Sequence, residues 1–87
     1  MPKRSFARLE EKYRRSKKDT GSPAVQVIRI SARIQEIAEH LKEHRKDHDA
    51  RLGLLKLLAK RRRLLSYLSK FEPNVYKRLV KDLDLKA

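Results

Sequence analysis

Apolar side chains recur along most of the chain three or four residues apart, which is the spacing of α-helices. Over residues 23–46 they form a narrow stripe, typical of a helix that packs against one partner helix. Its members are Val27, Ile30, Ile34, Ile37 and Leu41. Over residues 50–71 they are Leu54, Leu55, Leu57, Leu58, Leu64, Leu65, Leu68 and Phe71. No run alternates as a strand does, so the pattern predicts an all-α fold built on two long antiparallel helices.

The helix ends are predicted by residues that cap or interrupt helices. Ser22 followed by Pro23 is typical of an N-cap and a first helical position, so one long helix should begin at Pro23. The apolar pattern lapses around residues 46–49, where we expect a tight turn with Asp47 or Asp49 capping the next helix. A proline disfavours helical backbone in the residue before it, so residues 71–74 should end that helix and start a short one.

Two short helices are predicted beside the long ones. In the first, three apolar residues stand three and four positions apart, namely Phe6, Leu9 and Tyr13. In the last, the positions expected to face inward are Val75 or Tyr76, Leu79 and Leu83. A helix as short as the first is marginal by itself, so we expect residues 1–18 to hold a mobile N-terminal helix. The prediction is a single domain, residues 1–87, of four helices.

Composition narrows the class of function. The 87 residues include 24 Lys and Arg against 11 Asp and Glu, which gives a net charge of +13. Such a chain repels itself unless counter-charge is present, and a nucleic-acid backbone is the natural source. The absence of cysteine excludes disulfides, thiolate metal sites and cysteine nucleophiles. No apolar run is long enough to cross a bilayer or to act as a signal peptide, so we expect a soluble, intracellular protein.

Three histidines form the first candidate site. His40, His44 and His48 are four residues apart and would share one face if a single helix carried them all. Two such histidines can bind zinc, but no cysteine completes the ligand set and no glutamate directly follows His40. The helix is also expected to end before His48. We therefore favour polar residues at a helix end, or contacts to a polar ligand such as RNA, over a metal site.

A block of basic residues at positions 60–63 is the second candidate. Four consecutive residues of a helix spread over about 300° of its circumference, so at least one of them should neighbour the core. We expect Arg62 and Arg63 to lay their aliphatic stems along the core edge and to present guanidinium groups to phosphates. Tyr67, one turn later, is either a core residue or a contact to an RNA sugar or base.

The loop before the first long helix is the third candidate. Thr20, Gly21 and Ser22 form either a helix cap alone or a phosphate and sugar site, because glycine permits close approach of a ligand. Gln26 and Arg33 are seven residues apart and share a face, so a ligand on this loop could reach both. Paired carboxylates, a Walker-type loop and a Ser/His/Asp order are all missing, so we expect neither catalysis nor a cofactor.

Six motifs in one order carry a family resemblance. They are Asp19-Thr20-Gly21-Ser22-Pro23, Val25-Gln26-Val27, Glu39-His40-Leu41-Lys42, His44-Arg45-Lys46-Asp47-His48, Gly53-Leu54-Leu55-Lys56-Leu57 and Lys60-Arg61-Arg62-Arg63-Leu64-Leu65-Ser66-Tyr67-Leu68. In order and spacing they resemble the bacterial-type family of small-subunit ribosomal protein fifteen. The resemblance covers residues 19–85, whereas the first eighteen residues match only in forming a charged helix.

The resemblance implies a four-helix protein that binds the central domain of small-subunit ribosomal RNA early in assembly and catalyses nothing. In the family, one surface binds a junction where three RNA helices meet. Its matching positions here are Thr20, Gly21, Gln26, Arg33, Arg63, Tyr67 and Lys70. A second family surface, at the turn between the long helices, contacts the shallow groove of an RNA helix near a G·U pair. Its matching positions are His40, Asp47 and Ala50.

The second surface departs from the family pattern. The family commonly has serine at the position of Ala50, with histidine before it and arginine two residues later, whereas this chain has Asp49 and Leu52 there. The side chain of Ala50 makes no hydrogen bond, and Asp49 adds negative charge facing RNA. We expect a second site that is weakened or rearranged, although a lost hydrogen bond of about 0.5–1.5 kcal/mol does not cancel a surface this basic.

The implied partners are small-subunit ribosomal RNA, neighbouring small-subunit ribosomal proteins and a bridge to large-subunit RNA, with no membrane. The implied location is the ribosome, in the bacterial cytoplasm or an organelle, and the free protein is expected to be a monomer. The main alternative is a nonspecific nucleoid-type helical protein that binds DNA or RNA, although no compact helix-turn-helix pair is visible. A coiled-coil module is a third class, but the leucine-rich second long helix supplies an internal partner for the stripe of residues 27–41.

Overall fold

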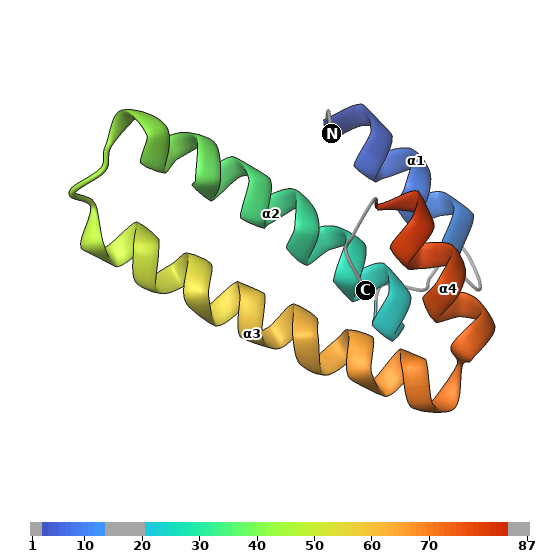
Figure 1. The fold of residues 1–87 in the computed structure, drawn as a ribbon. Coiled ribbons are helices and arrows are strands. Elements are labelled where there is room, and N and C mark those ends of the chain that lie inside the picture. The colour runs from blue at the N-terminus through green and yellow to red at the C-terminus, as the bar shows by residue number, and fades with distance from the viewer. Residues whose placement is uncertain (1–2, 14–20, 84–87) are drawn as a thin grey trace.

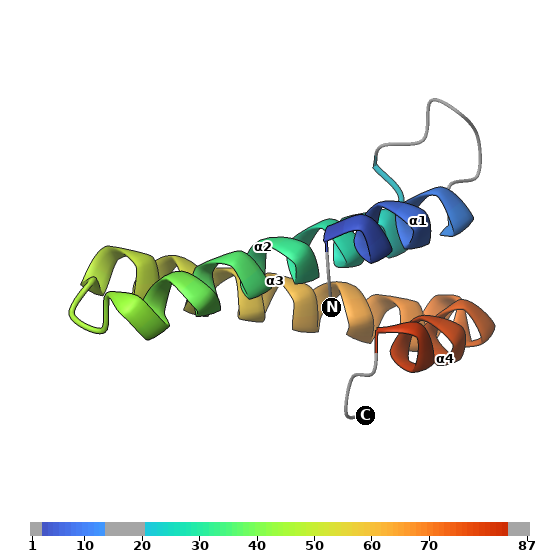
Figure 2. The ribbon, with the colours of Figure 1, turned by 90° about the horizontal axis from the view of Figure 1, so that it is seen from above.

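The computed structural model describes residues 3–13 and 21–83, which form four α-helices and, within those ranges, no strand. They are α1 (Lys3–Tyr13), α2 (Pro23–Glu43), α3 (His48–Phe71) and α4 (Pro73–Asp82). Helices α2 and α3 run antiparallel, side by side, while α1 lies against α2 and α4 against α3 at one end of this hairpin (Figures 1 and 2). The predicted all-α architecture is confirmed. None of these helices combines the length and apolar character needed to span a membrane.

The turn between the long helices, residues 44–47, begins and ends earlier in the chain than predicted. Helix α2 ends at Glu43, three residues before the expected position: the backbone N–H of His44 still bonds to the carbonyl of His40 (2.9 Å), but the backbone of His44 leaves helical geometry, with φ −127° and ψ 67°. Asp47 is the N-cap of α3, and its side chain accepts a hydrogen bond from the backbone N–H of Ala50 (3.0 Å). Of the two caps predicted, Asp47 is the one used, and α3 therefore starts at His48.

The other predicted helix boundaries are confirmed. Helix α2 begins at Pro23, with Ser22 at the N-cap in extended backbone. At the far end, Glu72 is both the C-cap of α3 and the N-cap of α4, and Pro73 occupies the first position of α4. Because a proline cannot donate a backbone hydrogen bond but suits a first helical turn, this single residue interrupts α3 and starts α4.

The buried core lies at the end where all four helices meet. Its members are Phe6, Tyr13, Ala24, Val25, Val27, Ile28, Leu68 and Leu79. Towards the turn, only α2 and α3 remain, so apolar residues such as Ile34, Ile37 and Leu54 are only partly buried. The distal half of the hairpin therefore exposes both of its sides, which makes them available for binding.

Two of the apolar residues predicted to pack along α3 are exposed instead. Phe71 and Leu55, both predicted with the core residues of their helix, are 60% and 58% exposed. The side of α3 that faces α2 carries residues at the helical spacing of Leu57, Leu64 and Leu68, and Leu68 alone on α3 is fully buried. Phe71 is the last residue of α3, where the described helices leave its ring uncovered.

Helix α1 has more tertiary contacts than its sequence suggests. Phe6 and Tyr13 are buried in the core, and the Tyr13 hydroxyl donates to Asp82 Oδ2 (2.6 Å). On α2, Arg29 Nε donates to Glu10 Oε1 (2.8 Å). Burial, and then the bond to Asp82, raise the pKa of Tyr13 to about 12. Mobility of this helix in solution stays a prediction, and residues 14–18 of that range lie outside the described residues.

Candidate nucleic-acid interface

One side of the α2–α3 hairpin brings together residues predicted for both RNA surfaces. On α2, Gln26, Arg33 and His40 are seven residues apart and so lie along one side of the helix. Arg33 and His40 line a groove of about 370 Å³ that Asp49, Ala50 and Gly53 of α3 line from across the hairpin.

The same side of α3 continues from this groove towards the four-helix end. Starting at Gly53, steps of three and four residues lead to Lys56, Lys60, Arg63 and Tyr67, all of them exposed. Sequence reasoning singled out all of these except Lys56, whose position seven residues before Arg63 was the available signal. We call this side of α2 and α3 the hairpin face. Its residues are Gln26, Arg33 and His40 on α2 and Gly53, Lys56, Lys60, Arg63 and Tyr67 on α3.

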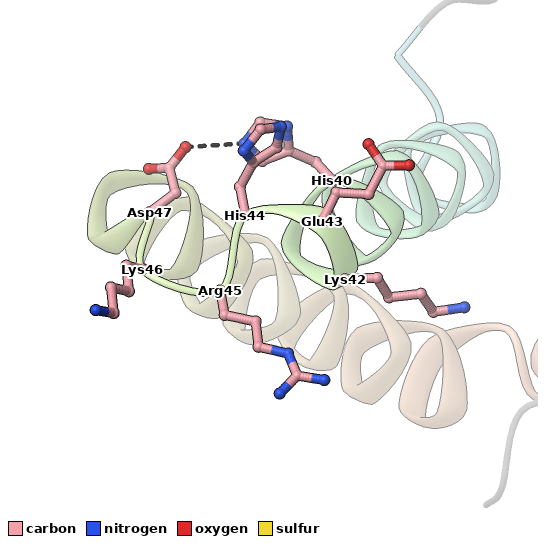
Figure 3. A pocket seen from close by; sticks show the side chains of 7 residues that line it. All are labelled: His40, Lys42, Glu43, His44, Arg45, Lys46 and Asp47. Atoms are coloured by element: carbon pink, nitrogen blue, oxygen red, sulfur yellow. Dashed lines mark hydrogen bonds and ion pairs between the residues drawn. The ribbon is translucent and has the colours of Figure 1, made fainter.

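Three residues predicted at the turn form one hydrogen-bonded network. His40 Nε2 lies 2.8 Å from Asp47 Oδ2, as the dashed line in Figure 3 marks, while Asp47 Oδ1 accepts from the Ala50 backbone N–H (3.0 Å). The Ala50 N–H, and then the His40 ring, lower the pKa of the Asp47 carboxyl. Ala50 thus takes part through its backbone, so the absence of a side-chain hydroxyl leaves the network intact.

A second hollow, of about 530 Å³, lies at the turn itself. Its lining is His40, Lys42, Glu43, His44, Arg45, Lys46 and Asp47. Figure 3 shows the two imidazoles together, with ring centroids 4.6 Å apart, and the three basic side chains directed to the opposite side of the ribbon. His40 lines both this hollow and the groove of the hairpin face, so the two are adjacent.

The histidine set does not share one helix. His40 belongs to α2 and His44 is its C-cap, whereas His48 is the first residue of α3, beyond the turn. Across residues 3–13 and 21–83, no three His, Cys, Asp or Glu side chains gather where they could hold a metal ion. His40 and His44 are exposed and line the hollow at the turn, and their contact with a polar ligand stays a prediction.

The loop that precedes α2 is described only in part, because Thr20 lies outside the described residues. Gly21 is exposed, and its carbonyl accepts a hydrogen bond from Gln26 Nε2 (2.6 Å). A Cβ atom added at Gly21 would meet nothing within 4 Å, so packing within the described chain does not require glycine there. Two of the predicted junction residues, Gly21 and Gln26, are thus in direct contact.

One residue of the basic block neighbours the core, as predicted. Arg61 is the partly buried residue, with Nη1 donating to the hydroxyl of buried Ser31 on α2 (3.4 Å), while Arg62 and Arg63 are exposed. The exposure of Arg62 and Arg63 fits the predicted presentation of their guanidinium groups at the surface, and the position of their aliphatic stems along the core edge stays a prediction. Arg61 stands seven residues before Leu68, on the side that faces α2, and this burial lowers the pKa of its guanidinium.

Arg62 belongs to a separate groove on another side of α3. This groove, of about 490 Å³, is lined by Leu58, Arg61, Arg62, Leu65, Ser66, Ser69 and, from α4, Tyr76. Arg62 and Arg63 are adjacent and both exposed, yet successive helix residues are turned by about 100°. The two side chains therefore lie on different surfaces of the molecule.

Tyr67 is exposed rather than buried, so the first of its two predicted roles, as a core residue, is wrong, and the contact to RNA stays a prediction. It is 48% exposed, and its ring centroid lies 4.8 Å from that of Phe71 at an interplanar angle of 40°. Lys70 Nζ lies 5.4 Å from the centroid of the Phe71 ring. Sequence reasoning missed Phe71 as a surface residue, although its position four residues after Tyr67 was a usable signal.

Comparisons with known proteins agree with the motif order. The family model described as ribosomal protein S15 matches residues 7–86. A relative from Helicobacter hepaticus, named small ribosomal subunit protein uS15, is 52% identical over 75 residues, or 86% of this chain and 83% of the relative. Relatives of the same name from Nitratiruptor sp. and Dictyoglomus thermophilum are 49% and 41% identical, covering 87% and 99% of this chain and 85% and 97% of their own lengths.

Proposed function

Because the chain belongs to the ribosomal protein S15 family, we propose that it is a structural constituent of the small ribosomal subunit and binds the central domain of its ribosomal RNA early in assembly. Its partners within the ribosome are then ribosomal RNA and neighbouring ribosomal proteins, and it is not an enzyme. The observation that carries the RNA-binding proposal is the hairpin face, where Arg33 and His40 of α2 share a groove with α3.

The chemistry of this face suits folded RNA better than duplex DNA. The major groove of an RNA helix is too narrow for side chains, so proteins contact its phosphates, its 2′-hydroxyls, its shallow minor groove and unpaired bases at junctions. Arginines such as Arg33 and Arg63 can bind phosphates in two-pronged fashion. Gln26 and His40 offer polar groups to hydroxyls, and the exposed ring of Tyr67 offers a surface to a base.

In our proposal, a three-way RNA junction occupies the half of the face nearer the four-helix end. Arg33 there pairs with Glu36 on its own helix (3.2 Å), with both side chains exposed. Exposed pairs of this kind contribute about 0–1 kcal/mol, so a phosphate can replace Glu36 at little cost. Gly21, whose missing side chain no packing explains, would permit close approach of the RNA backbone.

An adjacent RNA helix would occupy the turn. The His40, Asp47 and Ala50 network holds an imidazole at the junction of the two hollows, where it can meet 2′-hydroxyls in a shallow groove. Asp49 lines the groove of the hairpin face. Its carboxylate repels phosphates, so this contact should be the weaker of the two.

The test is equilibrium binding to three nucleic acids across a salt series. One is a small RNA three-way junction, the second is the same RNA with its junction paired through, and the third is duplex DNA. Preference for the open junction that survives high salt supports the proposal. Equal binding to all three that vanishes as salt rises would refute it, because that behaviour describes a nonspecific polycation of the nucleoid type.

Two adjacent arginines provide a matched pair of variants. Arg63→Gln should weaken junction binding about tenfold, because a hydrogen bond to a charged group contributes about 1.5–3 kcal/mol. Arg62→Gln removes the same charge from a neighbouring exposed residue outside the hairpin face, so its loss should be clearly smaller. Arg33→Gln should behave like Arg63→Gln. Equal losses from Arg62→Gln and Arg63→Gln would show that total charge, not this face, determines binding.

A further inference from the structure

The last turns of α3 expose two aromatic rings side by side. Tyr67 and Phe71 are 48% and 60% exposed, and their ring centroids lie 4.8 Å apart. Exposed apolar surface of this size is unfavourable in water, and contiguous patches of it usually mark binding sites. Stabilisation of the core does not account for Phe71, because the fully buried residue of this part of α3 is Leu68.

Cations lie beside the aromatic pair. Lys70 Nζ is 5.4 Å from the centroid of the Phe71 ring, and exposed Arg63 precedes Tyr67 by one helical turn. A ligand for this surface therefore combines a flat apolar part with negative charge at its edges. A nucleotide has this combination, since its base stacks on aromatic rings while its phosphates bind lysine and arginine.

We propose that Tyr67 and Phe71 together form a stacking site for an unpaired RNA base, with Lys70 and Arg63 binding the phosphates on either side. This inference rests on the proposed function and adds Phe71 to the contacts that the family resemblance implied. The rings are inclined by 40° rather than parallel, so a base stacked on one ring meets the other at an angle. A paired base has both faces covered by its neighbours in the RNA helix, so Phe71 contributes affinity for unpaired bases and not for paired ones.

The experiment uses the full chain and a fluorescent base, 2-aminopurine, placed at an unpaired position of the three-way junction. Phe71→Leu keeps an apolar side chain but removes the aromatic face. We expect it to bind about 5- to 20-fold more weakly than the original protein and to quench the reporter less, with the remaining quenching due to Tyr67. Leu55→Ala is the matched control, because Leu55 is equally exposed on the same helix (58%) without belonging to the pair. That control should change neither affinity nor quenching.

Two further measurements separate the possible failures. Circular dichroism and thermal melting report whether Phe71 merely stabilises its helix: a lower melting midpoint with unchanged RNA affinity and quenching would overturn the inference. A short single-stranded RNA carrying the same reporter supplies unpaired bases without a junction. Quenching that depends on Phe71 in this RNA would support the stacking site, whether or not the protein prefers the junction. A missing junction preference would refute the proposed function but not the stacking site. Quenching independent of Phe71 in both RNAs, or absent from both, would overturn the stacking site.

Discussion

Replacing Tyr13 by phenylalanine tests how α1 is held on the rest of the fold. The Tyr13 side chain is 8% exposed, and its hydroxyl donates to Asp82 Oδ2 at 2.6 Å. The same carboxylate oxygen accepts from Lys12 Nζ at 3.0 Å. Tyr13→Phe removes one hydroxyl and retains the buried ring, so the change in stability reports this hydrogen bond and little else.

The expected effect at neutral pH is a loss of about 1.5 kcal/mol in the free energy of unfolding. Hydrogen bonds to charged groups contribute about 1.5–3 kcal/mol. We take the lower end because the Asp82 side chain is 23% exposed and keeps its contact with Lys12 in the variant. Breakage of the bond therefore leaves no unsatisfied buried charge.

The difference between the two proteins should depend on pH. Burial, and next the bond to Asp82, raise the pKa of Tyr13 from 10.0 to about 12 in the folded state. Stability from such a group is complete below pH 10 and is lost as the pH rises towards 12. The complete loss in the free energy of unfolding amounts to about 2.7 kcal/mol, and about 1.4 kcal/mol of it is lost by pH 11. Because the variant has no hydroxyl to ionise, the two stabilities should become equal near pH 11.

The assay is urea unfolding followed by circular dichroism, for both proteins, at a series of pH values from 7 to 11. In parallel, phenolate absorbance of the original protein minus that of the variant follows the ionisation of Tyr13 alone. As a control, Tyr67→Phe alters an exposed hydroxyl and should change stability at neutral pH by less than about 0.5 kcal/mol.

A stability difference that stays constant from pH 7 to pH 11 would refute this reasoning. So would a difference spectrum in which the phenolate forms near pH 10, the ordinary value. Either result would mean that the Tyr13 hydroxyl is exposed to water and that α1 is not packed against Asp82 as described. On the acid side, Tyr13 and Lys12 lower the pKa of Asp82, so the same contact also contributes stability above pH 3.8 that is lost below it.

Three further substitutions test other parts of the structure. Leu68→Ala removes a fully buried side chain and should lower the free energy of unfolding by about 3 kcal/mol in urea titrations, whereas exposed Leu55→Ala should change it by under about 0.5 kcal/mol. Asp47→Ala removes the cap of α3 and should lower the melting temperature more than Asp49→Ala does. Because hydrogen bonds hold the pKa of Asp47 below 3.8, this difference in melting temperature should exist at neutral pH and shrink in acid. Ala50→Ser should leave junction binding unchanged and tighten binding to an RNA helix with a G·U pair by up to about 1.5 kcal/mol, and weaker binding in filter assays would show that the turn does not accommodate a hydroxyl.

Local patterns in the sequence determined the helices and most of their ends, although not the end of α2 at Glu43. The start of α2 at Pro23 and the cap at Asp47 follow from interactions within one helical turn, which the neighbouring residues alone decide. The shared side of Gln26, Arg33 and His40 also follows from spacing, because helical periodicity is the same in any helix. The RNA-binding role of these three residues remains a prediction, as does that of Thr20 and Lys70.

Only the tertiary structure decided which side of each helix is covered. Periodicity required one residue of the basic block to neighbour the core, but packing of α3 against α2 selected Arg61 and left Arg62 and Arg63 on two separate surfaces. The exposure of Phe71 likewise depends on where the other helices end. The position of α1 depends on contacts such as Tyr13 with Asp82, 69 residues apart in the chain. Spacing determines which residues lie together on a helix, whereas the rotation of that helix about its axis is determined by what it packs against.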